Sequence, residues 1–349
     1  MINTIIVDDS AVVREVIRDF LDEDGNFKIL CEAENGKEGL EKVLSLTPDL
    51  VISDIEMPEM NGLEMIKNIM SKQPVPIVVI TSHNTAKTAY DAAMSGALEF
   101  YSKDIFLKNM TEEKKHNIYN TLKRISGVKS RYTSSLPDEN INEQKNNTPS
   151  VNVTHKPQKT DMVVIASSTG GPKALSKLFS LMPADFPLPI AVVQHNSSGF
   201  DLDFSQWLNT YTPLNVKLAE DNETPVSGNI YIAKTDKHLE LGKSNDESGY
   251  ILRYNDNEPE QNQKPSADVL FRTAAQSCKD SLISVVLTGM GADGAQGTQK
   301  VKELGGITIA QDENSSLIYG MPKAAFETGC VDIVLPLEQI AQELVRLVK

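Results

Sequence analysis

Short apolar runs alternate with amphipathic stretches through the first 125 residues of the chain. Residues 11–24 repeat apolar side chains at the three- and four-residue spacing of a helix with one buried face. The strand-like runs between such stretches cover residues 4–7, 28–30, 50–53, 77–81 and 99–102. Five strands that alternate with helices predict an α/β domain with a parallel sheet.

The same alternation returns after residue 160, with one interruption. The strand-like runs here cover residues 162–167, 189–195, 281–289, 306–311 and 331–336. Between the second and the third of these runs, residues 229–254 show the pattern of a β-hairpin insert. The whole pattern therefore predicts an α/β protein with two doubly wound parallel-sheet domains, the second of which carries a hairpin insert.

Residues 126–160 separate the two patterns and contain few large apolar side chains. They are rich in Ser, Asn, Thr, Pro and Lys, so they offer too little apolar surface to offset the entropy lost on ordering. A chain of 349 residues also exceeds the about 250–300 residues that one hydrophobic core spans. We therefore predict domains at 1–125 and 161–349, joined by a flexible linker at 126–160.

Composition narrows the class of protein. A net charge of −14 argues against binding to nucleic acid and against an anionic membrane surface. Three widely spaced cysteines, Cys31, Cys278 and Cys330, indicate neither a disulfide framework nor a metal site. The chain begins without a signal-peptide pattern and lacks an apolar run of the about 20 residues that span a membrane. These features favour a soluble, cytoplasmic protein without membrane insertion, and none of them demands more than a monomer.

Five polar residues lie where strand-like runs of the first domain end. Asp8 and Asp9 follow the first run, Asp54 follows the third, Thr81 ends the fourth and Lys103 follows the fifth. Because the carboxyl ends of parallel strands share one edge of a sheet, the three carboxylates should converge and require a hard cation such as Mg²⁺. The hydroxyl and the ammonium group would complement a phosphoryl group on Asp54. A single Asp in such a place more often caps the next helix, but here five residues at strand ends match.

With these residues and the loop DIEMPEMNG at 54–62, the first domain resembles the receiver domain of bacterial two-component response regulators. The resemblance implies a flavodoxin-like fold, Asp54 as the phosphoacceptor and a chemotaxis histidine kinase as the phosphodonor. The implied Mg²⁺ ligands are Asp8, Asp9, Asp54 and the backbone carbonyl of Glu56, and the implied switch residues are Thr81, Phe100 and Lys103. In one departure, Asp104 follows the lysine where receivers usually have proline.

Three strand-like runs of the second domain end in residues that suit acyl transfer. Ser168 follows the first run, His195 ends the second, and Asp293 lies in the loop after the third. An imidazole activates an alcohol by taking its proton, and a carboxylate fixes the tautomer of the imidazole and stabilises its charged form. Glycine-rich turns at 169–171 and 289–291 let backbone N–H groups approach an oxyanion, and Met290 is our candidate donor.

Each of these residues also has a simpler interpretation. A serine beside glycine at a helix start is usually a cap, a histidine can belong to the core, and an aspartate can form a turn. The glycine-rich stretch could also bind phosphate at a helix N-terminus, although it contains neither GxGxxG nor GxxxxGKS/T. It lacks the GxSxG elbow as well, and the order Ser, His, Asp differs from the familiar triads, which disfavours an α/β-hydrolase, a trypsin-like or a subtilisin-like enzyme.

That order and five motifs resemble the catalytic domain of the chemotaxis-receptor methylesterases, the CheB family. The motifs are SSTGG, VQHNSSGF, IYIAKTDKHLEL, KPSADVLF and LTGMGADGA, and they extend over nearly all of residues 161–349. The resemblance implies a Rossmann-like fold, with Ser168 as the nucleophile, His195 as the general base and acid, and Asp293 as the orienting carboxylate. Thr169 and Met290 would support the loop and the oxyanion.

The chain departs from the family pattern at positions beside the implied triad. Ser167 stands where the family commonly has alanine, so we interpret it as a bystander. Ala166 stands where glycine is common, and Asn196 and Ser197 stand where the family has methionine and proline. None of these differences removes a triad residue, but they bear on the shape of the pocket.

A receiver followed by a methylesterase domain is the arrangement of phosphorylation-controlled receptor demethylation. The resemblance implies a phosphorylation-activated hydrolase that removes methyl groups from glutamate γ-methyl esters on methyl-accepting chemotaxis receptors and also deamidates receptor glutamines. Mg²⁺ would serve the receiver, and the esterase reaction would need no cofactor. Two other classes stay open: a receptor-binding module without catalysis, which the intact triad disfavours, and a transcription regulator, which the lack of a helix-turn-helix pattern disfavours.

Overall fold

The computed structural model divides the chain into two compact units, Met1–Gln144 and Lys145–Lys349, which are described separately below. The structure describes residues 1–82, 86–107, 110–128, 160–197, 199–244 and 249–348. Most of the predicted linker, residues 129–159, therefore lies outside the described residues. In the described part of the chain, no helix is both long enough and apolar enough to cross a membrane.

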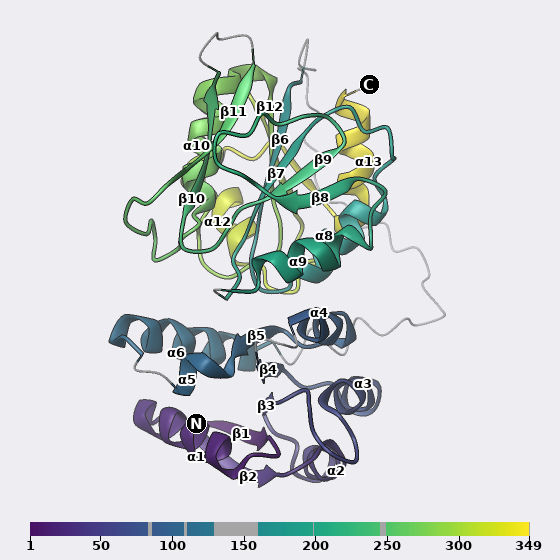
Figure 1. Cartoon of the computed structure of the whole chain (residues 1–349), viewed down its shortest axis with the longest axis vertical. Helices are drawn as coiled ribbons and strands as arrows, with labels where there is room; N and C mark the ends of the chain where they lie inside the picture. Colours follow the sequence, from purple (N-terminus) through teal and green to yellow (C-terminus); the bar gives the residue numbers. More distant parts are fainter. Residues whose placement is uncertain (83–85, 108–109, 129–159, 198, 245–248, 349) are drawn as a thin grey trace. The chain divides into compact units, whose positions relative to one another are not determined.

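The first unit is a five-stranded parallel sheet in the order β2-β1-β3-β4-β5, as its alternating pattern predicts (Figure 1). The strands are β1 (Ile2–Val7), β2 (Phe27–Ala33), β3 (Leu50–Ser53), β4 (Ile77–Thr81) and β5 (Glu99–Ser102). The helices are α1 (Ala11–Asp24), α2 (Gly36–Leu46), α3 (Gly62–Lys72), α4 (Ala86–Ser95), α5 (Lys103–Leu107) and α6 (Glu112–Ser126). The strand order reverses at β1, and such a switch point opens a crevice at the carboxyl ends of the strands.

Side-chain caps determine where several of these helices begin. Ser10 accepts a hydrogen bond from the N–H of Val13 at the start of α1, and Asn61 accepts one from the N–H of Glu64 at the start of α3. Gly25 ends α1 in the left-handed conformation with φ of 71°. The loops before α1 and α3 are therefore held in place at the edge where β1 and β3 end.

The second unit is a seven-stranded sheet in the order β14-β13-β12-β6-β7-β9-β8, and every pair in it is parallel. Its strands are β6 (Met162–Ser167), β7 (Ile190–Gln194), β8 (Asn215–Leu218), β9 (Asn229–Ile232), β12 (Leu282–Val286), β13 (Ile307–Gln311) and β14 (Ile333–Leu335). The helical elements are α8 (Gly171–Ser180), α9 (Asp201–Asn209), α10 (Ala267–Cys278), the 3₁₀ turn η2 (Lys279–Ser281), α11 (Ala295–Glu303), α12 (Met321–Glu327) and α13 (Leu337–Val348). The prediction of a second parallel α/β domain is confirmed.

The hairpin insert is shorter than the sequence pattern predicts. Its antiparallel strands are β10 (His238–Lys243) and β11 (Tyr250–Asn255). The start of the predicted hairpin, Asn229–Ile232, instead forms β9 of the main sheet, between β7 and β8. The reason is burial, because residues 230–232 are buried on both faces, as expected for an inner strand of a parallel sheet.

Two faces of the second sheet pack against different elements. On one face Val164 and Ala166 of β6 join a core cluster with Leu241 of β10 and with Leu270 and Phe271 of α10. Figure 1 shows α10 and the hairpin together on that side of the sheet, and α8 and α13 on the other. Residues that alternate along β6 therefore point toward either α10 or α8.

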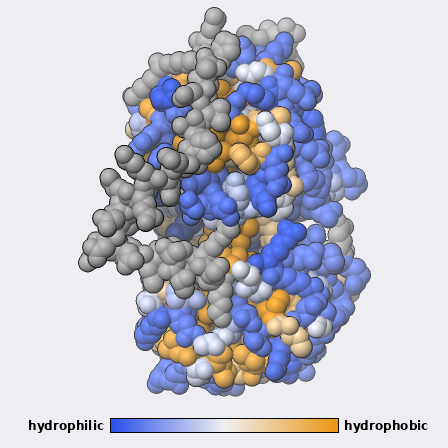
Figure 2. Space-filling view, turned by 180° about the vertical axis from the view of Figure 1, so that it is seen from behind, coloured by the Kyte–Doolittle hydropathy of each residue, from blue (hydrophilic) through white to orange (hydrophobic). Residues whose placement is uncertain are grey.

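The outer surface is mostly polar. Figure 2 shows hydrophilic side chains over most of the visible face, with hydrophobic side chains in smaller separate patches. This distribution agrees with the net charge of −14 and with cores that lie inside the two units.

Candidate phosphoacceptor and active sites

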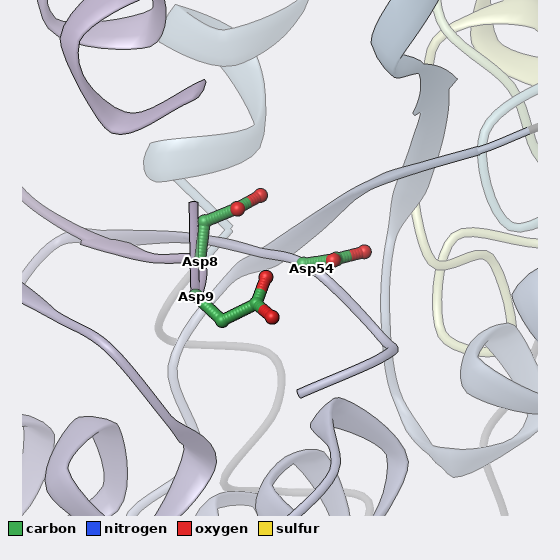
Figure 3. Close-up of side chains that lie close together, drawn as sticks. All are labelled: Asp8, Asp9 and Asp54. Atoms are coloured by element: carbon green, nitrogen blue, oxygen red, sulfur yellow. The ribbon is translucent and has the colours of Figure 1, made fainter. Parts of the chain in front are cut away.

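Three carboxylates meet at the carboxyl edge of the first sheet, as predicted. Asp8 and Asp9 follow β1, Asp54 follows the neighbouring strand β3, and one oxygen from each lies within 4.8 Å of the others. Figure 3 shows the three side chains extending on the same side of the chain. Asp8 and Asp54 are buried, whereas Asp9 is exposed.

Lys103 brings a positive charge to this pocket. Its Nζ lies 2.8 Å from Asp8 Oδ2 and 2.7 Å from Asp54 Oδ2. Burial raises the pKa of Asp8 above its ordinary value, although Lys103 and the N–H of Ser10 oppose this. Burial alone would lower the pKa of Lys103, but the hydrogen bonds to Asp54 and Asp8 raise it, so the ammonium group stays charged.

The donor set of the pocket fits a hard divalent cation. Three carboxylates with one exposed member offer oxygen ligands and leave room for water, as Mg²⁺ requires. The single lysine that contacts two of them does not balance their charge. Glu56 lies two residues after Asp54 in the loop before α3 with its side chain exposed, and its backbone carbonyl remains the ligand that the sequence predicts.

Thr81 and Phe100 lie on β4 and β5, the two strands that follow β3 in the sheet order. Thr81 is the last residue of β4 and is fully buried, and it pairs in register with Ser102, the residue before Lys103. Phe100 is buried on β5, and its ring meets that of Tyr90 on α4 edge to face, with 4.9 Å between centroids. The strand register thus brings the predicted hydroxyl and lysine to the same edge as Asp54.

Strand register also places Ser168 and His195 next to each other in the second unit. Ser167 of β6 pairs with Gln194 of β7, and the Ser167 hydroxyl donates to Gln194 Oε1 at 2.7 Å. The Gln194 amide also donates to the backbone carbonyls of Ser168 (3.1 Å) and His195 (2.9 Å). Gln194 therefore joins the two strand ends, a role that its position in an apolar run did not reveal.

The position of Gly171, the first residue of α8, shows which face of the sheet carries the contact between Ser167 and Gln194. A Cβ at Gly171 would lie 1.9 Å from Gln194 Oε1, so Ser167 and Gln194 face α8. Ser168 and His195 directly follow the last residues of β6 and β7, and continued alternation of the backbone would direct them toward the face of α10.

Asp293 is held in a fully satisfied site beside His195. His195 Nε2 lies 2.9 Å from Asp293 Oδ2. The Ser266 hydroxyl and the N–H groups of Ala267 and Asp268, at the start of α10, also donate to Asp293 at 2.7–2.9 Å. Burial would raise the pKa of Asp293, but His195 and these backbone N–H groups lower it below its ordinary value. The carboxylate is therefore charged and fixed in orientation.

The other ring nitrogen of His195 is available for proton transfer. Because Asp293 accepts from Nε2, the Nδ1 atom is the free nitrogen, and it is buried without a hydrogen-bond partner among the described residues. In the same part of the chain no hydrogen bond joins the Ser168 hydroxyl to this ring. The structure therefore brings His195 and Asp293 into contact and places Ser168 at the adjoining strand end, a looser geometry that is common without substrate.

A tight backbone turn carries Ser168. Gly170 adopts φ of 79°, and the N–H of Gly171 donates to the Ser168 carbonyl at 2.6 Å. On the side of β12, the N–H of Ser168 donates to the carbonyl of Thr288, whose hydroxyl donates to the carbonyl of Thr169. Thr169 itself is buried in this loop, where its backbone carbonyl accepts from Thr288.

The loop that holds Met290 lies against Ser168. A Cβ on Gly289 would lie 2.9 Å from Ser168 Cβ and 2.3 Å from the sulfur of Met321, so only glycine fits. In the described chain the backbone N–H of Met290 donates no hydrogen bond, which leaves it free as a donor. Sequence reasoning missed the segment at 312–321, whose Ile318 carbonyl accepts from Gly289, because it shows no chemical pattern of its own.

Together these features define a class: a response regulator whose acidic receiver domain is joined to a second α/β domain with a Ser, His and Asp edge. Residues 4–114 match the family model described as response regulator receiver domain, and residues 163–344 match that described as CheB methylesterase. The chain belongs to the CheB methylesterase family.

Curated relatives extend over the whole chain. A protein of Pyrococcus abyssi is 37% identical over 351 residues, which cover 100% of this chain and 94% of that protein. A protein of Thermotoga maritima is 35% identical, with 100% and 99% covered. Both are named protein-glutamate methylesterase/protein-glutamine glutaminase. The crystal structure of the Thermotoga maritima CheB methylesterase catalytic domain is similar with a TM-score of 0.53 and 40% identity, covering 54% of this chain and all of that one.

The packing of Gly289 against Ser168 predicts a loss of stability on adding one methyl group. We expect Gly289→Ala to lower the free energy of unfolding of the second unit by about 1–3 kcal/mol, as overpacking does. Denaturant unfolding followed by the fluorescence of Trp207, the single tryptophan, reports on this unit. Gly242→Ala is the control, because its Cβ would meet no atom closer than 3.7 Å. Equal unfolding midpoints for the two variants would contradict the packing.

Proposed function

We propose that this protein is a phosphorylation-activated hydrolase that demethylates glutamate γ-methyl esters on chemotaxis receptors and deamidates receptor glutamines. The observation that carries the proposal is the 2.9 Å contact of His195 with the buried Asp293, beside the turn that exposes Ser168. The names of the curated relatives support both reactions, since they join a methylesterase and a glutaminase. In this proposal the substrates are methyl-accepting receptors, and the biological role of the enzyme is sensory adaptation.

In the proposed mechanism, Ser168 Oγ attacks the ester carbonyl while His195 Nδ1 takes its proton. Asp293 stabilises the imidazolium that forms, and the backbone N–H of Met290 donates to the developing oxyanion. The C–O bond to methanol then breaks as His195 returns the proton to the leaving oxygen. Water attacks the acyl-enzyme by the same route and restores glutamate and the serine. A glutamine substrate reacts identically, except that ammonia leaves.

The receiver domain supplies the control of this reaction. We assign Asp54 as the acceptor of a phosphoryl group from a chemotaxis histidine kinase. Asp8, Asp9, Asp54 and the backbone carbonyl of Glu56 would hold Mg²⁺, which supplies positive charge to the transferred phosphoryl group. Lys103, which already contacts Asp54 at 2.7 Å, would pair with that group.

Phosphorylation changes the charge at Asp54, and two buried residues on β4 and β5 would respond. Thr81 ends β4, the strand next to β3, and Phe100 packs against α4 through Tyr90. We propose that a hydroxyl contact to the phosphoryl group shifts Thr81 and Phe100 between two arrangements. Because only the phosphorylated state makes that contact, it biases the equilibrium toward the active form.

The nucleophile is tested by Ser168→Ala with receptor that carries labelled methyl groups. We expect methanol release to fall at least about 10³-fold, as for the loss of a serine nucleophile elsewhere. Ser167→Ala is the matched control, because its hydroxyl points to Gln194 on the opposite face, and we expect its rate to stay within a few-fold of wild type. Equal release from Ser168→Ala and wild type would reject the mechanism and favour a non-catalytic receptor-binding module.

The control by phosphorylation is tested by Asp54→Asn. With a small phosphodonor and Mg²⁺, we expect wild-type methanol release to rise by about 5- to 150-fold, the usual span of allosteric coupling. Asp54→Asn or a chelator should abolish the rise without changing the basal rate. Asp22→Asn, which alters an exposed carboxylate of α1, should retain it. A rise that survives in Asp54→Asn would show that another residue is the phosphoacceptor.

A further inference from the structure

His238 is a fully buried histidine that the mechanism above does not use. It is the first residue of β10, in the hairpin insert. Its Nδ1 accepts a hydrogen bond from the N–H of Ser266 at 3.1 Å, and its Nε2 lies 3.0 Å from the carbonyl oxygen of Glu258. A backbone N–H can only donate and a carbonyl can only accept, so the ring is neutral, with its proton on Nε2. Both ring nitrogens are thus committed.

Ser266 links this ring to the proposed active site. It precedes α10 and is itself fully buried. Its hydroxyl donates to Asp293 Oδ1 at 2.8 Å, while Asp293 Oδ2 accepts from His195. A continuous series of hydrogen bonds therefore joins Glu258, His238, Ser266, Asp293 and His195.

The hairpin holds the His238 ring in a rigid place. The next residues of β10, Leu239 and Leu241, are buried in the core cluster that includes Leu270 and Phe271 of α10. Both the ring and the helix that begins after Ser266 are therefore anchored by the same packing. A shift of the ring would move the Ser266 backbone, and with it the hydroxyl and the two N–H groups that Asp293 accepts.

We propose that His238 is a positioning residue for the Ser168, His195 and Asp293 site, and that the hairpin insert serves to place it. It acts through Ser266, whose backbone it fixes and whose hydroxyl orients Asp293. The inference rests on the proposed function only in assigning Asp293 a role in catalysis. A purely structural His238 would instead contribute to folding and leave the orientation of the His195 ring unchanged.

The His195 ring gives a readout that needs no substrate. The full-length protein contains five histidines, so selective ¹⁵N labelling yields a simple spectrum, in which His195→Gln identifies the His195 signals. We expect Ser266→Ala and His238→Leu to move the His195 Nε2–H signal, because each weakens the hold on Asp293. His238→Asn should move it less, since Asn Oδ1 replaces Nδ1 as the acceptor. Ser284→Ala is the matched control, a buried serine of β12 whose hydroxyl has no hydrogen-bond partner among the described residues.

Kinetics on methylated receptor gives the second readout. We expect Ser266→Ala and His238→Leu to lower kcat by about 10- to 100-fold with little change in KM, the effect of a small misplacement of catalytic groups. When Asp293→Ala is already present, we expect either substitution to lower kcat by no more than about twofold further. The reason is that the effects of substitutions in groups that act as a unit are not additive.

Three results would overturn the proposal. The first is an unchanged His195 signal together with an unchanged kcat in Ser266→Ala. This variant removes one hydroxyl, so it tests the contact between Ser266 and Asp293 even where His238→Leu does not fold. The second is a full further loss of kcat on adding His238→Leu to Asp293→Ala. The third is equal kcat in His238→Asn and His238→Leu. A failure of the proposed function would look different, because Ser168→Ala would then keep full activity. The ¹⁵N spectrum of the His195 ring would still test the positioning role of His238 independently of activity.

Discussion

Parallel strand pairing is the constraint on which both sites depend. Neighbouring parallel strands run in the same direction, so their carboxyl ends and the loops that follow them collect at one edge. In the first unit this pairing brings Asp8 and Asp54 together from β1 and β3. In the second it sets Ser168 beside His195 from β6 and β7. Residues far apart in the sequence become neighbours without any covalent link between them.

Prediction from the sequence succeeds where a polar residue directly follows a strand. The strand-end residues of both units could be found because a long apolar run predicts a buried strand, and the first polar residue after it must lie at the edge. Asp293 is less direct, since it lies seven residues beyond the end of β12 in a glycine-rich loop, and its place after a strand-like run and its match to the motif LTGMGADGA together single it out.

The residues that sequence reasoning missed act through contacts between distant segments. Gln194 ends an apolar strand run and looks like a strand residue, yet its amide joins the backbones of two strand ends. Ser266 and His238 belong to motifs whose roles depend on where α10 begins and where the hairpin packs. The strand β9 was assigned to the hairpin because alternation within 229–254 cannot show which partner a strand pairs with. Such information lies in tertiary packing and has no local pattern.

The hydrogen bonds of the two carboxylates fit the different roles proposed for them, Asp54 as the phosphoacceptor and Asp293 as the orienting carboxylate. A carboxylate offers about four lone-pair sites. Asp293 accepts from Ser266 and Asp268 on Oδ1, and from Ala267 and His195 on Oδ2, so its lone-pair sites are filled, which suits the orienting role proposed for it. Asp54 accepts from the N–H of Ile55 on Oδ1 and from Lys103 on Oδ2, which leaves lone pairs for a phosphoryl group and a cation. Both carboxylates lie at the carboxyl edge of a parallel sheet. They differ in the number of hydrogen-bond donors around them, and this difference fits the different chemistry proposed for each.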